Sequence, residues 1–391
     1  MNGTNSSRRE IIPILCLLAF VDTFGYAIVV PLLPFAARDY GASTLAIGAI
    51  FASFSLCQLI AAPSLGSLSD RFGRRPLLLL SQCGTAAGFV LMILARSVWP
   101  LLLSRVIDGA TAGNVSVINA AMLDRYNKRF WARQFTYLAT ATGAGLVAGI
   151  IVGAALAPLG LAAASTAALS LSLLSLATTW FVLPETLVRR EPIAMRVVWR
   201  RAIADAPLRQ AGGVKLLFII AQSAFVLAFP LYLLKRLGYA DERAALMMAA
   251  LLAIGAAFQL SAVVRVIGAV GERTTALFGF AALCVGATAA ALAQQLLWVA
   301  IASVLVVCAV AALGPALTAL YAKTNRSLDE GALMGVDQSL ASAGQTIGPA
   351  LGYGALAVSG AAGYGVVCAG LAAAGLLLLG RSRIGGSLGS E

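Results

Sequence analysis

Long apolar runs, separated by short polar segments, follow one another along almost the whole chain. Each run has about the 20 residues that an α-helix needs to cross the hydrocarbon core of a bilayer. The runs are continuously apolar, whereas the strands of a membrane β-barrel alternate apolar and polar residues. The pattern predicts an all-α polytopic membrane protein. We place twelve transmembrane helices at about 11–34, 44–66, 75–95, 98–121, 135–157, 161–183, 214–235, 245–267, 274–294, 296–321, 331–356 and 361–380.

The longest polar stretch separates the first six helices from the last six. It covers 184–213 and contains three prolines and six arginines. We predict an N-terminal six-helix bundle at 1–183, a cytoplasmic linker at 184–213 and a C-terminal six-helix bundle at 214–391.

A weak internal repeat indicates that the two bundles are related. Residues 255–276 lie between the eighth and ninth helices, as 58–79 lie between the second and third, and Gln259 echoes Gln58. Two pseudo-symmetric halves are typical of secondary transporters, whose substrate sites lie near the midplane where the halves meet.

The positive charges predict the orientation of the chain. With the N-terminus in the cytoplasm, 22 of the 28 Lys and Arg residues fall in cytoplasmic segments, five lie outside, and Arg105 lies within the membrane. Lys and Arg accumulate in cytoplasmic loops. We therefore expect a multi-pass protein of the cell inner (cytoplasmic) membrane with both termini cytoplasmic. The net charge of +12 then reflects these loops and not a nucleic-acid partner.

Composition excludes several kinds of chemistry. The chain is 60% hydrophobic and 11% charged, with no histidine, whereas soluble domains have roughly 25% charged residues. Any mechanism that needs a His base, ligand or proton relay is excluded. No phosphate-binding Walker A motif and no cluster of metal ligands is present. We expect no enzyme activity, no cofactor and no metal. The expected partners are protons, a small-molecule substrate and the lipid bilayer, and the expected state is a monomer.

Charged residues inside the apolar runs are the first candidates for function, since each costs at least ~2.5–3.5 kcal/mol at the middle of a span. Asp22 lies about 16 Å into the first helix at 1.5 Å per residue, near the midplane, with no cation nearby in the sequence. Asp22 could bind a proton or a cationic substrate, or it could be a structural hydrogen-bonding group. Arg105 and Asp108 are three residues apart, so they share a helix face and can pair. They could form a neutral structural pair. Alternatively, binding of a proton or of substrate at Asp108 could free Arg105 to change partners.

The seventh predicted helix carries a mixed aromatic and polar set that suits an amphipathic molecule. These side chains could equally pack against neighbouring helices. The candidates for lining a substrate cavity are Gln58, Gln222, Phe225, Phe229, Tyr232 and Asp337, of which Asp337 would lie nearest the inner vestibule.

The polar segment from Gly66 to Pro76 is predicted to be a short cytoplasmic loop between the second and third helices. Asp70 can pair with arginines of its own loop or face the end of the eleventh helix, and Asp124 can pair with Arg74. Ion pairs made in one conformation alone would bias alternating access. The loop would also anchor and cap the two helices. Its candidate gating residues are Gly66, Asp70, Arg71, Gly73, Arg74, Arg75 and Asp124.

These residues match the signature G-x-x-x-D-R-x-G-R-R, through which the chain resembles the major facilitator superfamily. Asp22 and the segments 31–34, 103–109 and 331–349 further resemble its drug:proton antiporter branch, which includes the tetracycline-resistance exporters. The resemblance covers nearly all of 11–380. It implies proton-coupled efflux of a small amphipathic drug-like or natural-product molecule by alternating access, as in multidrug efflux and antibiotic resistance. It also implies a role for Arg105 in proton coupling.

The chain departs from this branch at three positions. Ile150 stands where the antiporter motif of the fifth helix has proline. Gly88 and Leu283 stand where the tetracycline pumps have acidic residues, so tetracycline is not the expected substrate. Small residues that permit close helix packing remain, namely Gly145, Gly149, Gly153, Gly348 and Pro349.

Two alternatives remain open. Proton-coupled uptake or facilitated transport of a small metabolite is favoured by Ile150 in place of proline. A non-transporting receptor or scaffold on the same fold is disfavoured by Asp22, because a scaffold has no use for a titratable carboxyl at the midplane.

Overall fold

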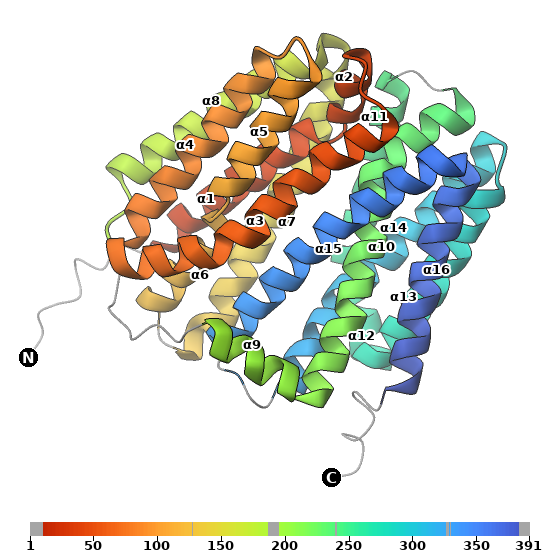
Figure 1. The fold of residues 1–391 in the computed structure, drawn as a ribbon. Coiled ribbons are helices and arrows are strands. Elements are labelled where there is room, and N and C mark those ends of the chain that lie inside the picture. Colours follow the sequence, from red (N-terminus) through yellow and green to blue (C-terminus); the bar gives the residue numbers. More distant parts are fainter. Residues whose placement is uncertain are drawn as a thin grey trace, which may run out of the picture.

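The computed structural model describes residues 11–126, 128–186, 195–238, 241–325, 328 and 330–382. These residues form long helices joined by short turns, with no strand among them. Figure 1 shows the helices that precede α9 on one side of the molecule and those that follow it on the other. The first group comprises α1 (Ile12–Val29), α2 (Leu33–Asp39), α3 (Thr44–Phe72), α4 (Arg74–Ile93), α5 (Val98–Thr111), α6 (Asn114–Arg125), α7 (Lys128–Leu156), the 3-10 turn η1 (Ala157–Leu159) and α8 (Gly160–Phe181).

The second group begins after the short helix α9 (Met195–Ala204), which lies in the predicted linker. It comprises α10 (Ala206–Leu237), α11 (Asp241–Phe258), the π-helical segment η2 (Gln259–Val263), α12 (Val264–Val270), α13 (Glu272–Leu292), α14 (Leu296–Thr324), α15 (Glu330–Val358) and α16 (Gly360–Arg381).

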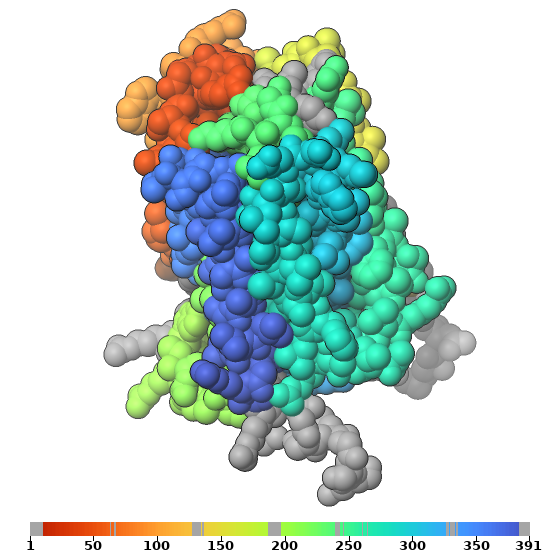
Figure 2. Space-filling model, turned by 90° about the vertical axis from the view of Figure 1, so that its right-hand side faces the viewer, coloured from red at the N-terminus to blue at the C-terminus, as the bar shows by residue number. Residues whose placement is uncertain are grey.

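The predicted spans correspond to these helices. Among the described residues, ten segments have the length and hydropathy of a membrane span, and the segment Tyr137–Phe181 contains both α7 and α8. The helix α15, with 29 residues, supplies the predicted eleventh span. The described residues therefore form the predicted all-α polytopic fold. Figure 2 shows the face formed by α13 and α16. These helices expose apolar side chains, as a lipid-facing surface requires: Phe278, Val285, Val366 and Leu377.

The segment Gly66–Pro76 is not the loop that the sequence predicted. The helix α3 continues to Phe72 and α4 begins at Arg74, so Gly73 alone lies between them, with a φ of 111° that favours glycine. The Glu185 carboxylate accepts hydrogen bonds from the backbone nitrogens of Arg74 at 2.9 Å and Arg75 at 3.3 Å. It thereby caps the first turn of α4. A single glycine and a carboxylate from elsewhere in the chain replace a loop.

The predicted fourth span is broken. The helix α5 ends at Thr111 and α6 begins at Asn114, and the backbone nitrogen of Gly113 donates to Ser81 Oγ at 3.1 Å. The free backbone donor at the break is thus satisfied inside the bundle. The break places Asn114 at the first position of a new helix, beside α1.

The helix that contains the predicted seventh span, 214–235, begins before 214. The helix α10 begins at Ala206, because Asp205 caps it by accepting from the backbone nitrogen of Leu208 at 3.3 Å and Pro207 suits the first turn. Lys215, which the charge count assigned to the cytoplasmic segments, therefore lies well inside a helix of membrane-spanning length. The division at 183 and 214 into separate bundles remains a prediction.

Equivalent glycine triplets show that the two halves are built alike. A Cβ on Gly149 of α7 would lie 2.6 Å from the Phe24 carbonyl oxygen of α1, and Gly145 and Gly153 meet α1 in the same way. On α15, Gly344, Gly348 and Gly352 meet α10, where a Cβ on Gly352 would lie 2.6 Å from the Ala224 carbonyl oxygen. The first and fifth spans thus pack as the seventh and eleventh do, through glycines spaced four apart.

The halves meet along α3 with α15 and α7 with α11. The rings of Phe51 and Tyr353 stack at 5.8 Å between α3 and α15, and Gln58 Oε1 accepts from Ser342 Oγ at 3.3 Å. On the other side, Ile150 of α7 packs in a buried cluster that includes Ala249 of α11. The contacts between the two halves thus run through α3, α7, α11 and α15.

Candidate functional site

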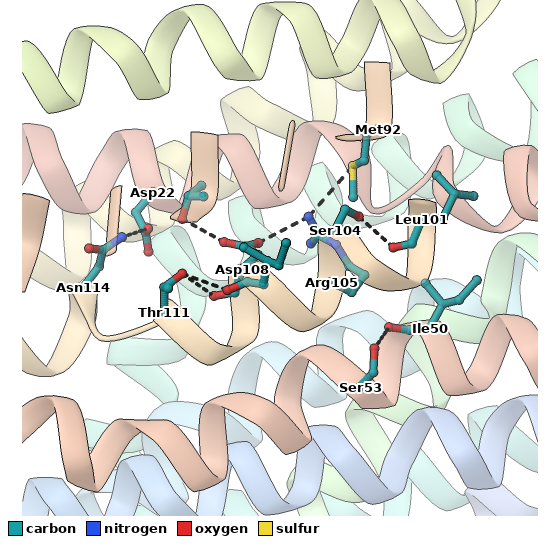
Figure 3. Close-up of polar contacts among 12 residues, drawn as sticks. Asp22, Ile50, Ser53, Met92, Leu101, Ser104, Arg105, Asp108, Thr111 and Asn114 are labelled. Carbon is teal, nitrogen blue, oxygen red and sulfur yellow. Dashed lines mark hydrogen bonds and ion pairs between the residues drawn. The ribbon is translucent and has the colours of Figure 1, made fainter. Parts of the chain in front are cut away.

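Arg105 and Asp108 of α5 form a buried ion pair within the first half. Arg105 Nη2 lies 3.2 Å from Asp108 Oδ2, and Thr85 Oγ1 of α4 donates to Asp108 Oδ1 at 2.7 Å. Figure 3 shows Asn114, Asp22, Asp108 and Arg105 following one another along α5 and its break. The pairing expected from the spacing of Arg105 and Asp108 is present, and Thr85 is a partner that the sequence did not reveal.

The Arg105 guanidinium has donors to spare. It lies 5.6 Å from the centre of the Phe54 ring and 3.9 Å from Met92 Sδ. Its Nε has no hydrogen-bond partner among the described residues. A buried cation with one carboxylate contact and an unused donor is suited to exchanging partners, because a second anion can be accommodated without breaking a saturated network.

Asp22 has an amide and not a cation as its partner. Asn114 Nδ2 donates to Asp22 Oδ1 at 2.5 Å. The contact depends on the break between α5 and α6, which the sequence did not predict. Asp22 lies in the middle of α1, as its distance from the start of the span predicted.

Tyr26 and Phe54 connect the buried charged residues Asp22, Arg105 and Asp108 to a cavity. Tyr26 follows Asp22 by one helical turn, and its ring lies 6.0 Å from that of Phe54, over which Arg105 is placed. Tyr26 also lines a cavity of about 310 Å³ between the halves. A change at Asp22 or Arg105 can therefore reach the cavity wall through two aromatic rings.

The cavity is formed by α1 and α7 of the first half and by helices of the second half. Of the predicted lining residues, Gln222 and Phe225 lie in its wall, together with Ile150. Two further glutamines, Gln259 of η2 and Gln345 of α15, were not selected from the sequence as lining residues. None of the described residues that line the cavity is charged.

The other predicted lining residues lie elsewhere. Phe229 and Tyr232 belong to an aromatic stack with ring centres 5.7 Å apart, and Tyr232 Oη donates to the Ala290 carbonyl oxygen at 2.7 Å. Gln58 lies in the seam between α3 and α15. Tyr232 and Gln58 therefore pack against neighbouring helices. Phe229 instead lines a small apolar pocket together with Phe225 and Met248, which also line the cavity.

Asp337 does not line the cavity either, because it pairs with Lys215 of α10. The Lys215 ammonium also donates to Thr318 Oγ1 at 3.0 Å and lies 5.6 Å from the centre of the Tyr321 ring. The Lys215 side chain is 8% exposed and that of Asp337 is 32% exposed. Lys215 was not selected from the sequence, because at the edge of the predicted seventh helix it was counted with the cytoplasmic charges.

The predicted gating residues surround Arg74. Arg74 Nη1 lies 2.6 Å from Asp70 Oδ1, and Arg74 Nε lies 2.9 Å from Asp124 Oδ2, with both Arg74 and Asp124 buried. Arg75 stacks over Trp180 at 5.9 Å and Arg71 over its neighbour Phe72 at 5.4 Å.

These gating contacts all lie in the first half. Gly66 lies within α3, and Gly73 forms the turn described above. The side chains of 330–332 and 334 at the start of α15 are outside the described residues, so contact between Asp70 and the eleventh span stays a prediction.

Two similarly built halves of membrane-length helices, with a cavity between them and a buried charge cluster linked to its wall through Tyr26, are the features of a membrane transporter. Residues 15–269 match the family model described as Major Facilitator Superfamily. The chain therefore belongs to the major facilitator superfamily, as the signature around Asp70 predicted.

Its relatives include proteins of tetracycline resistance. Tetracycline resistance protein, class G, of Vibrio anguillarum is 31% identical over 350 residues, which are 87% of this chain and 88% of that protein. Tetracycline resistance protein, class B, of Escherichia coli is 27% identical over 356 residues, 89% of this chain and 88% of that protein. The resemblance to the tetracycline-resistance exporters is thus confirmed.

Solved structures share the fold. The human organic anion transporter MFSD10 (TETRAN) has a TM-score of 0.75 at 21% identity, covering 96% of this chain and 100% of that one. The D-xylose-proton symporter has a TM-score of 0.75 at 16% identity, covering 95% and 97%. At such identities the likeness concerns the fold alone.

Proposed function

We propose that this protein exports a small amphipathic, drug-like or natural-product molecule in exchange for protons, by alternating access. The observation that supports this most directly is the position of Asp22 and the Arg105–Asp108 pair. Tyr26, one helical turn from Asp22, lines a cavity of about 310 Å³ to which the two halves contribute. Its ring lies 6.0 Å from that of Phe54, over which the guanidinium of Arg105 is placed. We place the protein in the cell inner membrane as a monomer, with both termini in the cytoplasm, from the charge bias of the loops and from its bacterial exporter relatives.

Protonation would change the contacts of these groups. A neutral Asp108 attracts Arg105 less than a carboxylate does, and a neutral Asp22 can donate a hydrogen bond as well as accept one. Binding of a proton to these acids then shifts the equilibrium between the inward-open and outward-open forms, provided that the proton binds one form more tightly. The ion pairs of Arg74 with Asp70 and Asp124 would act as the gate, because they lock the ends of α3, α4 and α6 together.

The cavity indicates the class of substrate. Its volume lies at the lower end of the range for drug-sized ligands, and its polar groups include three glutamines. Such a wall suits a molecule with a broad apolar surface and a few hydrogen-bonding groups.

Tetracycline remains an unexpected substrate. Leu283 is fully buried, and a Cβ on Gly88 would lie 3.4 Å from Asp108 Cβ. Neither position offers a carboxylate to the transport path.

Transport in reconstituted vesicles tests the proposal. We would impose a pH gradient and follow a panel of amphipathic antibiotics and cationic dyes with wild type, Asp22→Asn and the matched control Asp39→Asn, whose side chain is 60% exposed. Uphill transport by wild type and the control, but not by Asp22→Asn, supports the proposal. Equal uphill transport by Asp22→Asn would show that the proton site is assigned wrongly.

Ile150 favours one alternative, uptake or facilitated passage of a small metabolite. Ile150 is 3% exposed and joins α7 to α11 through apolar packing where the antiporter motif has proline. If wild type only equilibrates its substrate, whatever the pH gradient, this alternative is correct and antiport is wrong.

A further inference from the structure

A second, much smaller cavity lies within the first half, between α1, α4, α6 and α8. It has about 10 Å³ of space, which is about the minimum that one water molecule needs. Its polar lining consists of Asp22, Gln82, Thr85, Asn114, Ser172 and Ser175.

Two buried amide oxygens of this lining have no hydrogen-bond partner in the part of the chain that the structure describes. Gln82 Nε2 donates to Ser175 Oγ at 3.0 Å and to Thr179 Oγ1 at 2.9 Å, and Asn114 Nδ2 donates to Asp22. Gln82 Oε1 and Asn114 Oδ1 accept no hydrogen bond from any described residue, although Gln82 is 4% exposed and Asn114 is 7% exposed. A buried acceptor that is left unsatisfied destabilises the folded protein.

The chemistry of the lining specifies the occupant. Two amide oxygens and the Asp22 carboxylate are all acceptors, so the group that fills the space has to donate hydrogen bonds. A water molecule donates two, and its own oxygen accepts from a protonated carboxyl or a hydroxyl. An apolar occupant would leave the acceptors unsatisfied.

Thr85 extends this site to the second acid. Thr85 lines the cavity that Asp22 lines, and its hydroxyl donates to Asp108 Oδ1 at 2.7 Å. The two acids are thus linked by one cavity and one hydroxyl.

We propose that the cavity holds one water molecule and that this water and Thr85 relay a proton between Asp22 and Asp108, with Gln82 and Asn114 holding the water in place. The relay rests on the proposed function, in which these acids bind the coupling proton. Protonated Asp22 gives its proton to the water, the water gives one of its own protons to Thr85 Oγ1, and the Thr85 hydroxyl proton passes to Asp108 Oδ1. One O–H bond breaks and one forms at each step, and the net result is one proton moved.

No second charged side chain among the described lining residues competes for the proton. Asp22 is the one charged residue among the described residues that line this cavity, and Arg105 contacts Asp108 through its other carboxylate oxygen, Oδ2. Arrival of the proton at Asp108 neutralises the partner of Arg105. The relay therefore connects proton uptake at one acid to the release of a buried arginine at the other.

The test compares two transport readouts of the full-length protein in vesicles, with one amphipathic dye that wild type transports. The first readout is accumulation driven by a pH gradient, and the second is dye exchange at equal pH, which needs no net proton movement. Thr85→Val keeps the shape and removes the hydroxyl, so the ratio of driven accumulation to exchange should fall about ten-fold or more. Thr85→Ser restores the hydroxyl and should restore the ratio. Thr166→Val, at an exposed threonine of α8, is the matched control and should leave the ratio unchanged.

Gln82→Leu provides a second test if Thr85→Val fails to fold, and it should lower the ratio in the same way because the water loses an acceptor. A wild-type ratio in either folded variant overturns the relay while the proposed function stands. Absence of pH-driven accumulation in wild type overturns the proposed function itself. Accumulation driven by a Na⁺ gradient at equal pH would show that the oxygen-lined cavity binds Na⁺ and not a relay water.

Discussion

The Asn114 amide nitrogen lies 2.5 Å from a carboxylate oxygen of Asp22, across the break that ends α5 and begins α6. A helix that ran unbroken through Ala112 and Gly113 would not present the first residue of a new helix to α1. The break is thus a structural device that supplies a buried carboxyl with a neutral partner, which can remain bonded to it in both protonation states.

Replacing this partner should weaken coupling. Asn114→Leu removes the amide and keeps the approximate size, so Asp22 loses its hydrogen bond, and pH-driven transport should fall about ten-fold. Asn119→Leu, on the same helix, is the control. Vesicle transport under an imposed pH gradient measures both variants, and an unchanged rate in Asn114→Leu would show that the contact has no part in coupling.

The buried pair of Arg74 and Asp124 should contribute more to stability than an exposed pair. Their side chains are 7% and 2% exposed, and loss of one partner of a buried pair costs about 3–5 kcal/mol. Asp124→Asn should lower the melting temperature in detergent markedly. Glu272→Gln, which breaks a pair whose lysine side chain is 57% exposed, should cost at most about 1 kcal/mol. Equal decreases in the melting temperature of both variants would contradict a stabilising role for the pair of Arg74 and Asp124.

The glycines of α7 should be intolerant of any side chain on the face toward α1. Gly149→Val would place a Cβ 2.6 Å from the Phe24 carbonyl oxygen, and overpacking of this kind typically costs about 1–3 kcal/mol or more. Gly143 has open space where its Cβ would lie, so Gly143→Val is the matched control. Thermal unfolding in detergent and the yield of folded protein measure the difference, and comparable stability of both variants would refute the packing.

The sequence predicted the fold well and the site in part, for identifiable physical reasons. Span-length apolar runs and loop arginines determine the number and order of helices, and the spacing of Arg105 and Asp108 determines a local contact. The helix break at Gly113 and the single-residue turn at Gly73 depend on partners more than 30 residues away, namely Ser81 and Glu185. Helical periodicity carries no information about such partners.

Lys215 illustrates a second kind of difficulty. A lysine at the edge of a predicted helix, next to an arginine-rich segment, looks like one more cytoplasmic charge. Only the position of the Asp205 cap reveals that α10 begins well before it and that Lys215 lies inside the helix. The choice between cavity and packing for Phe225 and Phe229 likewise depends on where α11 and α14 pass. No local pattern separates two aromatics one turn apart on the same helix.

The cavity should limit the size of the substrate. Ala256 lines it, whereas the next residue, Ala257, is exposed. Ala256→Trp should therefore abolish transport of the larger members of a dye series and spare the smallest, while Ala257→Trp should leave the series unchanged. Transport rates across the series in vesicles decide the matter, and equal profiles for the two variants would place the substrate path elsewhere.

The pair of Lys215 and Asp337 allows a distinction between stability and transport. Asp337→Leu alone leaves a buried ammonium without its carboxylate, which should destabilise the second half strongly. The double variant Lys215→Met with Asp337→Leu removes both charges, and replacing a buried pair by apolar residues is often neutral or stabilising. We expect the double variant to melt near the wild-type temperature and to retain pH-driven transport, because the coupling acids lie in the first half. A stable double variant that exchanges substrate but no longer accumulates it would instead make this pair a second coupling element.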